Sequence, residues 1–216
     1  MKMKHGDNSP GAVFLDRDGV LNEIVYHQDL GLLDSPFTLK QFKLMPGSAR
    51  AVANINKSGL LAILISNQPG VAKKHYAIEV HQAMDRKLTS LLAKESAHLD
   101  DRFYCLDHPE ARIKKYRKNS DWRKPMPGMI LAATAKYSID RERSWMIGDS
   151  IIDIQAAHAA GIKAILIGSL HCYTCRLLAE YQIRPEYAVA TIEEAVALIL
   201  GKYSDCQRYV PFPTEV

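Results

Sequence analysis

Two aspartates separated by one residue are the first side chains whose spacing points to chemistry. The apolar segment Ala12–Leu15 leads directly into Asp16, Arg17 and Asp18. Alternate side chains of an extended strand lie on the same side, so the two carboxylates are expected to converge while Arg17 turns away. Two close carboxylates favour a shared cation, Mg2+ above all, and one could attack phosphorus while the other transfers protons. The alternative is an exposed loop that happens to carry two acids.

Polar side chains that suit a phosphoryl group follow a second apolar segment. Ser66 and Asn67 come directly after Leu60–Ile65 and stand shortly before Gly70. A small hydroxyl and an amide at the end of a strand can donate hydrogen bonds to phosphoryl oxygens. A tight turn or a helix cap would have the same composition.

A third aspartate follows a later apolar segment. Trp145–Ile147 leads into Gly148 and Asp149, and Asp153 stands one helical turn further on. Asp149 is placed to complete a magnesium site, Gly148 would let the backbone approach the ligand, and Asp153 has the spacing of a supporting residue. The alternative is that Asp149 or Ser150 only caps the helix that follows.

Arg123 and Lys124 stand just before a helix that is expected to begin near Pro127. A lysine here would neutralise charge on a transferred phosphoryl group, although an ordinary surface lysine is the alternative. Of the four clusters, one follows the first expected strand, one follows the second, one precedes a helix and one follows the fourth strand. Ligands of parallel α/β sheets bind beyond the carboxyl ends of the strands, so this order favours one shared site.

The periodicity of the chain predicts an α/β fold. Apolar runs of four to six residues alternate with longer helical patterns, which is typical of a mainly parallel, buried sheet. The expected strands are Ala12–Leu15, Leu60–Ile65, Arg102–Cys105, Trp145–Ile147, Ala164–Ile167 and Tyr187–Val189. The expected helices are Gly47–Ser58, Ala77–Lys94, Gly128–Tyr137, Ile151–Ala160, Tyr173–Tyr181 and Ile192–Leu200. Two stretches, 23–44 and 106–127, fit neither pattern, and the second is a long basic loop.

Length and composition set further limits. The 216 residues suit one globular domain, which we place at residues 12–201, between an N-terminal extension, 1–11, and a C-terminal tail, 202–216. No apolar run approaches the roughly 18 residues that cross a bilayer, and the start carries no signal-peptide core. We therefore expect a cytoplasmic protein that binds no membrane, with reduced thiols and a monomeric state by default. The net charge of +4 suits a small anionic metabolite but is too small to indicate nucleic acid.

The motifs together resemble the haloacid dehalogenase superfamily of phosphohydrolases. The first motif reads VFLDRDGVL, Ser66 stands at the second, Lys124 at the third, and GDSIID forms the fourth. The segments FLDRDGVLN, SNQPGVA and RKPMPGMI are most similar to the branch that contains heptose-bisphosphate and histidinol-phosphate phosphatases. The resemblance implies a three-layer, Rossmann-like fold that is essentially capless, and the acid at Asp18 favours a phosphatase over a dehalogenase.

The resemblance also implies roles for the acidic residues. Asp16 would be the nucleophile that forms an aspartyl-phosphate, and Asp18 would be the general acid and base. Mg2+ would be held by Asp16, Asp149 and the backbone carbonyl of Asp18. Asp153 would support this metal site without binding the metal itself.

The remaining roles concern the substrate. The resemblance implies that Ser66 and Lys124 hold the phosphoryl oxygens and that Asn67 and Arg123 help to recognise the substrate. The expected activity is hydrolysis of a phosphorylated sugar such as D-glycero-D-manno-heptose 1,7-bisphosphate, with histidinol phosphate or another small phosphorylated metabolite as alternatives. A phosphotransferase or mutase would need a larger cap to exclude water, and a non-catalytic binding protein is the remaining alternative.

The long loop departs from the pattern of that branch, whose members carry a structural zinc on a C-x-H segment and a later C-x-C. The four positions here are Cys105, Asp107, Ser120 and Trp122. This set cannot supply four zinc ligands, so we expect no zinc in the loop. A displaced metal site that uses Cys105, Cys172 and Cys175 is a hypothesis. A further one is that the basic segment 112–118 contacts a second phosphate, the alternative being a solvated loop.

Overall fold

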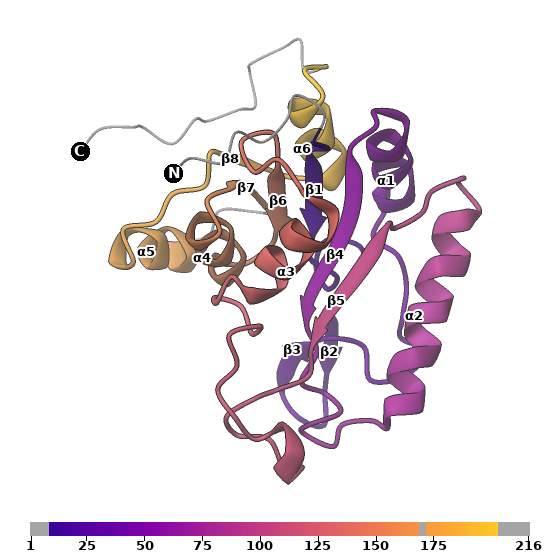
Figure 1. Ribbon diagram of the computed structural model, residues 1–216. Coiled ribbons are helices and arrows are strands. Elements are labelled where there is room, and N and C mark those ends of the chain that lie inside the picture. The colour runs from indigo at the N-terminus through magenta and orange to yellow at the C-terminus, as the bar shows by residue number, and fades with distance from the viewer. Residues whose placement is uncertain (1–8, 169–171, 203–216) are drawn as a thin grey trace.

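The computed structural model describes residues 9–168 and 172–202 and has a parallel six-stranded sheet at its centre (Figure 1). The strand order is β5-β4-β1-β6-β7-β8, and every neighbouring pair is parallel. The strands are β1 (Ala12–Leu15), β4 (Leu61–Asn67), β5 (Asp101–Cys105), β6 (Trp145–Gly148), β7 (Lys163–Ile167) and β8 (Tyr187–Val189). Each expected strand is present, with ends that differ by at most two residues.

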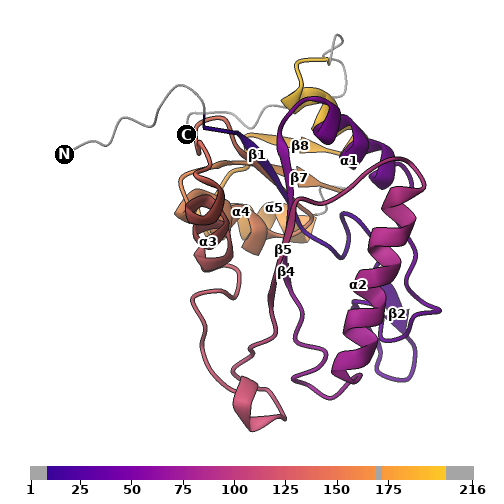
Figure 2. The same cartoon turned by 45° about the vertical axis from the view of Figure 1, so that its right-hand side comes forward.

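Helices cover both faces of the sheet, so the predicted three-layer α/β fold is confirmed (Figure 2). In β1, Val13 and Leu15 face a core shared with α1, α2 and α6. Phe14 faces a second core, which is shared with α3, α4 and α5. The helices are α1 (Ser48–Lys57), α2 (Ile78–Ala93), α3 (Gly128–Tyr137), α4 (Ile151–Ala159), α5 (Cys172–Glu180) and α6 (Ile192–Ile199).

The burial of β1 fixes the position of the acids that follow it. All four residues of Ala12–Leu15 are fully buried, and Phe14 is in register with Ile63 of β4 and Met146 of β6. Each large apolar side chain that leaves water here contributes roughly 1.5–3 kcal/mol to stability. A one-residue slip would exchange the two faces of the strand, so packing fixes its register strongly.

The two stretches without a predicted pattern contain short elements. Within 23–44, β2 (Val25–His27) and β3 (Leu32–Asp34) form an antiparallel hairpin, and within 106–127, η1 (Lys114–Tyr116) is a single 3₁₀ turn. Both strands of the hairpin are partly exposed and each includes a polar residue, so neither shows a continuous apolar run. The ring of Phe37 lies between the imidazoles of His27 and His75, with centroid distances of 3.7 and 4.5 Å, and this stack fastens the hairpin to the loop that follows β4.

No helix within residues 9–168 and 172–202 is long and apolar enough to cross a membrane. The expected N-terminal extension and C-terminal tail lie mostly outside the described residues, and the proposed domain boundaries therefore remain predictions.

Candidate active site

Strand order brings the predicted site residues together. The neighbours β4, β1 and β6 are parallel, so their carboxyl ends share one edge of the sheet. Ser66 lies near the end of β4, Asp16 directly follows β1, and Asp149 directly follows β6. The backbone N–H of Asp16 donates to the carbonyl of Ile147 at 3.1 Å, which extends the β1–β6 pairing up to the first acid.

Three carboxylates form a cluster at this edge. Asp16, Asp149 and Asp153 each place an oxygen within 4.8 Å of the others, and this is the only such group of His, Cys, Asp and Glu among the described side chains, those of residues 9–168 and 176–202. Burial raises the pKa of Asp16 to about 6 and that of Asp149 to about 8, and the mutual repulsion of the acids adds to this effect. Hard carboxylate oxygens that repel one another fit a hard divalent cation such as Mg2+.

Lys124 is a positively charged side chain in direct contact with this carboxylate cluster. Its Nζ lies 2.9 Å from Oδ1 of Asp16, 2.6 Å from Oδ1 of Asp153 and 3.3 Å from the carbonyl of Ile65. Burial alone would lower the pKa of Lys124, but the two carboxylates outweigh it and raise the pKa above its usual range. The predicted lysine is therefore a buried, charged member of the site.

The start of α4 is arranged around Asp153. Ser150, not Asp149, caps the helix, and Ser150 and Asp153 form a reciprocal capping box. The fully buried Asp153 side chain fills the space beside Gly148, where a Cβ would overlap it. Gly148 therefore makes room for Asp153, and its expected role in letting the backbone approach a ligand stays a prediction. Capping by Ser150 leaves Asp149 free to face Asp16.

Gly19 is a site residue that sequence reasoning missed. Its φ is +80°, and a Cβ built on it would overlap the carboxylate of Asp149. The left-handed turn after β1 therefore has two reasons to be glycine, one conformational and one steric. The signal in the sequence was the glycine directly after the second aspartate.

Arg17 does not turn away from the acids. Its side chain is fully buried, and Nη2 lies 3.1 Å from Oδ1 and 3.2 Å from Oδ2 of Asp18. Asp18 also accepts hydrogen bonds from Asn22 at 2.9 Å and from Gln68 at 2.5 Å. None of these three donors was predicted from the sequence, because single polar residues beside a motif carry no periodic signal.

The predicted substrate-binding residues take different positions. Ser66 is buried, and its Oγ accepts a hydrogen bond from Gln68 at 3.0 Å. The Asn67 amide pairs with both backbone groups of Lys124, each at 3.0 Å, and so holds the lysine in place. Arg123 donates to the carbonyl of Asp107 at 3.4 Å, and burial lowers its pKa.

The long loop is held by contacts between protein groups. The carboxylate of Asp107 lies 3.4 Å from Nζ of Lys118, and the Trp122 ring packs 5.9 Å from that of Phe103. Cys105 is buried, with Sγ 3.9 Å from the carbonyl of Asp107. Two of the four positions discussed above, Asp107 and Trp122, therefore make contacts that need no metal.

The hypothesis of a displaced metal site receives no support from the topology. Cys105 ends β5 at one edge of the sheet, whereas α5 connects β7 and β8 at the other and packs against α4. The side chains of Cys172 and Cys175 lie outside the described part of the structure.

A HAD-hydrolase-like family model matches residues 121–195. The chain is 40% identical over 160 residues to D-glycero-D-manno-heptose-1,7-bisphosphate 7-phosphatase of Thermosynechococcus vestitus, covering 72% of this chain and 78% of that relative. The enzyme of the same name from Chlorobaculum tepidum is 32% identical over 200 residues, covering 90% and 96%.

A solved structure gives a similar result. D,D-heptose 1,7-bisphosphate phosphatase from B. bronchiseptica, crystallised with magnesium and phosphate, superposes with a TM-score of 0.73 at 25% identity. The superposition covers 89% of this chain and 99% of the other.

Proposed function

Because the chain belongs to the HAD-like hydrolases, in the family of the curated heptose-bisphosphate phosphatases, we propose that Asp16 and Asp18 hydrolyse a heptose bisphosphate with Mg2+. The expected family and the expected class of enzyme, a phosphatase, are confirmed. The observation that carries the proposed site is the cluster of Asp16, Asp149 and Asp153 around the charged Lys124.

The first step is an attack by Asp16 on phosphorus. The backbone N–H of Arg17 at 2.7 Å and Nζ of Lys124 at 2.9 Å both donate to Oδ1 of Asp16, and this fixes the orientation of the carboxylate. As the Asp16 oxygen bonds to phosphorus, the ester P–O bond breaks and Asp18 gives its proton to the leaving oxygen. Water then attacks the aspartyl-phosphate, Asp18 takes its proton, and Asp16 is released with inorganic phosphate.

Mg2+ would be held by Asp16, Asp149 and the backbone carbonyl of Asp18. When bound, it neutralises charge on the phosphoryl oxygens and relieves the repulsion among the acids. Lys124 contributes a fixed positive charge, and Ser66 offers a hydroxyl to the phosphoryl group. Asp153 keeps Lys124 and the start of α4 in position.

The proposed substrate is D-glycero-D-manno-heptose 1,7-bisphosphate or a similar phosphorylated sugar. The identity to curated phosphatases with that substrate supports the choice. Histidinol phosphate is the second candidate, because of the motif resemblance. A mutase is disfavoured, because segment 23–44 folds as a short hairpin and not as a separate cap.

We also propose that the loop of residues 106–127 binds no zinc. The contacts of Asp107 with Lys118 and of Trp122 with Phe103 support this, since the first joins the two halves of the loop and the second packs the loop against β5 without a metal. Metal analysis of protein purified without chelator tests the proposal. One equivalent of zinc that Cys105→Ser removes would overturn it.

Phosphate release from a panel of heptose, hexose, glycerol and histidinol phosphates, with and without Mg2+, tests the function. Wild type should be active only with the metal, and Asp16→Asn should be inactive on every ester. Asp140→Asn, a change of the same type at the opposite end of β1, is the control and should retain activity. Equal rates for Asp16→Asn and wild type would refute the proposed nucleophile.

A further inference from the structure

The carboxylate of Asp18 is surrounded by hydrogen-bond donors on both oxygens. Oδ1 accepts from Nη2 of Arg17 at 3.1 Å, from its Nε at 3.4 Å and from Asn22 at 2.9 Å. Oδ2 accepts from Nη2 of Arg17 at 3.2 Å and from Nε2 of Gln68 at 2.5 Å. The three donor side chains are fully buried, whereas Asp18 is 17% exposed. Rotation of the carboxylate would break several of these bonds together.

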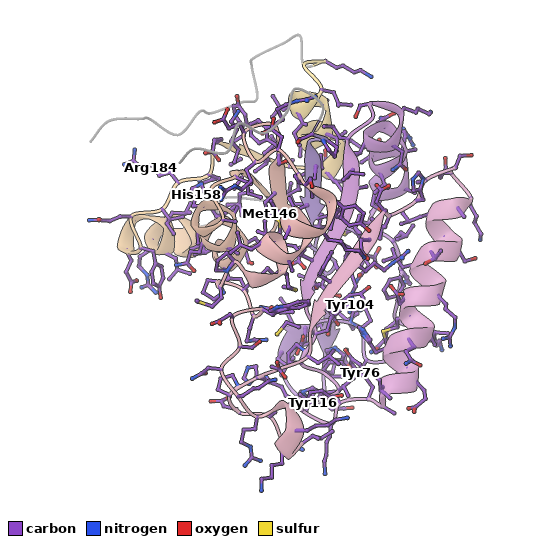
Figure 3. All side chains as sticks on the ribbon, in the orientation of Figure 1. Tyr76, Tyr104, Tyr116, Met146, His158 and Arg184 are labelled. Atoms are coloured by element: carbon purple, nitrogen blue, oxygen red, sulfur yellow. The ribbon has the colours of Figure 1, made fainter. Side chains whose placement is uncertain are left out.

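The Gln68 amide is itself fixed in orientation. Its Nε2 also donates to Oγ of Ser66 at 3.0 Å, and its Oε1 accepts from the Tyr76 hydroxyl at 3.3 Å. Tyr76 lies beyond the carboxyl end of the sheet, on the side of α2 (Figure 3). Both N–H groups of the amide are thus used, one on the proposed acid and one on the hydroxyl proposed to meet the phosphoryl group. Gln68 therefore fixes the distance between these two groups.

The cost of burying Arg17 indicates that its position matters. It is the largest fully buried side chain among the described residues, and its Nη1 has no hydrogen-bond partner there. Burial of a guanidinium is unfavourable unless it is paired, and a buried donor without a partner adds to the free-energy cost. The pairing with Asp18 offsets this cost, and the ring of Phe42, 5.8 Å from the guanidinium carbon, adds a cation–π contact.

We propose that Gln68 and Arg17 are positioning residues for proton transfer by Asp18, and that Gln68 locks Oδ2 of Asp18 to the Ser66 hydroxyl. The inference rests on the proposed function and deepens it. Oδ1 has three donors and Oδ2 has two, one of which also touches Ser66, so Oδ2 is the oxygen that faces the phosphoryl group. It carries the proton to the leaving oxygen as the P–O bond breaks, and it receives one from water in the second step.

The dependence on the leaving group tests the proposal. A sugar alkoxide needs a proton when it leaves, whereas p-nitrophenolate does not, and kcat/KM reports the steps through departure of the leaving group. Gln68→Met keeps the length of the side chain but removes its donors. Because general acid catalysis contributes roughly 10²–10⁴-fold, we expect kcat/KM of Gln68→Met to fall about 10- to 100-fold on heptose 1,7-bisphosphate. On p-nitrophenyl phosphate it should change less than about threefold.

Tyr76→Phe provides a milder variant that is expected to fold. It removes only the hydroxyl that orients the Gln68 amide, so the same selective loss should appear at a smaller size, about two- to fivefold on the heptose ester. Ser144→Ala is the control, because Ser144 is a fully buried hydrogen-bonding residue at the opposite end of β1. It should affect both substrates equally, if at all.

Two results would overturn the positioning role. One is an equal loss on the two substrates by Gln68→Met and Tyr76→Phe, and the other is no loss on either. Failure of the proposed function would look different from failure of the positioning role. In that case wild-type protein would have no magnesium-dependent activity on either substrate.

Discussion

The Lys124→Met variant should have a much lower free energy of unfolding than wild type. The lysine side chain is 1% exposed and lies 2.9 Å from Asp16 and 2.6 Å from Asp153. Its removal leaves the carboxylate cluster without the lysine counter-charge. Breaking a buried, hydrogen-bonded ion pair costs about 3–5 kcal/mol, a large part of the roughly 5–15 kcal/mol that stabilises a typical domain.

The measurement is urea unfolding followed by circular dichroism at pH 8 in EDTA, with the free energy of unfolding extrapolated to water. Lys136→Met is the matched control, because its Nζ lies 2.8 Å from Asp101 but the side chain is 58% exposed. Solvent screens that pair, so its removal should have little effect.

The double variant Lys124→Met/Asp153→Asn sharpens the test. Asp153→Asn removes one of the two charges that Lys124 compensates, so the double variant should recover part of the stability lost in Lys124→Met. A loss below about 1 kcal/mol for Lys124→Met, or strictly additive effects of the two changes, would refute the reasoning, because directly paired charges must couple.

Three further predictions concern other positions. Burial, with Arg17 adding to it, lowers the pKa of His81 to about 4, against the opposing effects of Asp85 and Asp18, and the edge of the ring meets Tyr104. At His81 the unfolded state thus binds more protons between about pH 6.5 and 4, whereas the raised pKa values of Asp16 and Asp149 act on stability in the opposite direction. His81→Gln removes only the first effect, so relative to wild type it should gain on the order of 3 kcal/mol of stability in urea titrations as the pH falls through this range. Gly19→Ala should weaken Mg2+ binding in calorimetry about 10- to 100-fold, since its Cβ displaces Asp149; unchanged affinity would show that Asp149 does not bind the metal. Tyr104→Phe should lower the unfolding temperature, because it leaves Asp85 without a hydrogen bond of 2.7 Å at a cost of about 1–3 kcal/mol; an unchanged temperature would mean that solvent satisfies Asp85.

The central sheet was predictable because its signal is local. Segments such as Ala12–Leu15 and Tyr187–Val189 begin and end where expected, since apolar runs bounded by polar residues describe buried strands directly. The hairpin of β2 and β3 was not predictable, because its partly exposed strands contain no continuous apolar run. It is held through Phe37, which stacks on His27 of β2 and on the distant His75.

The chemical groups of the site and their order along the chain could be predicted from the sequence alone. Asp16, Ser66, Lys124 and Asp149 were identified as one set because each lies in a short motif. Such a motif depends only on residues that are close to one another in the sequence. Their convergence follows from strand order, which places β4, β1 and β6 side by side.

The folded structure was needed to show how the site is supported. It revealed that Arg17 folds back on Asp18, that Gln68 joins Asp18 to Ser66 and that Asn67 holds the backbone of Lys124. These contacts join segments as far apart as β4 and the turn before α3, and no pattern of neighbouring residues encodes them. They form because buried polar groups must find partners, and which partners are within reach is settled by the packing of the whole chain.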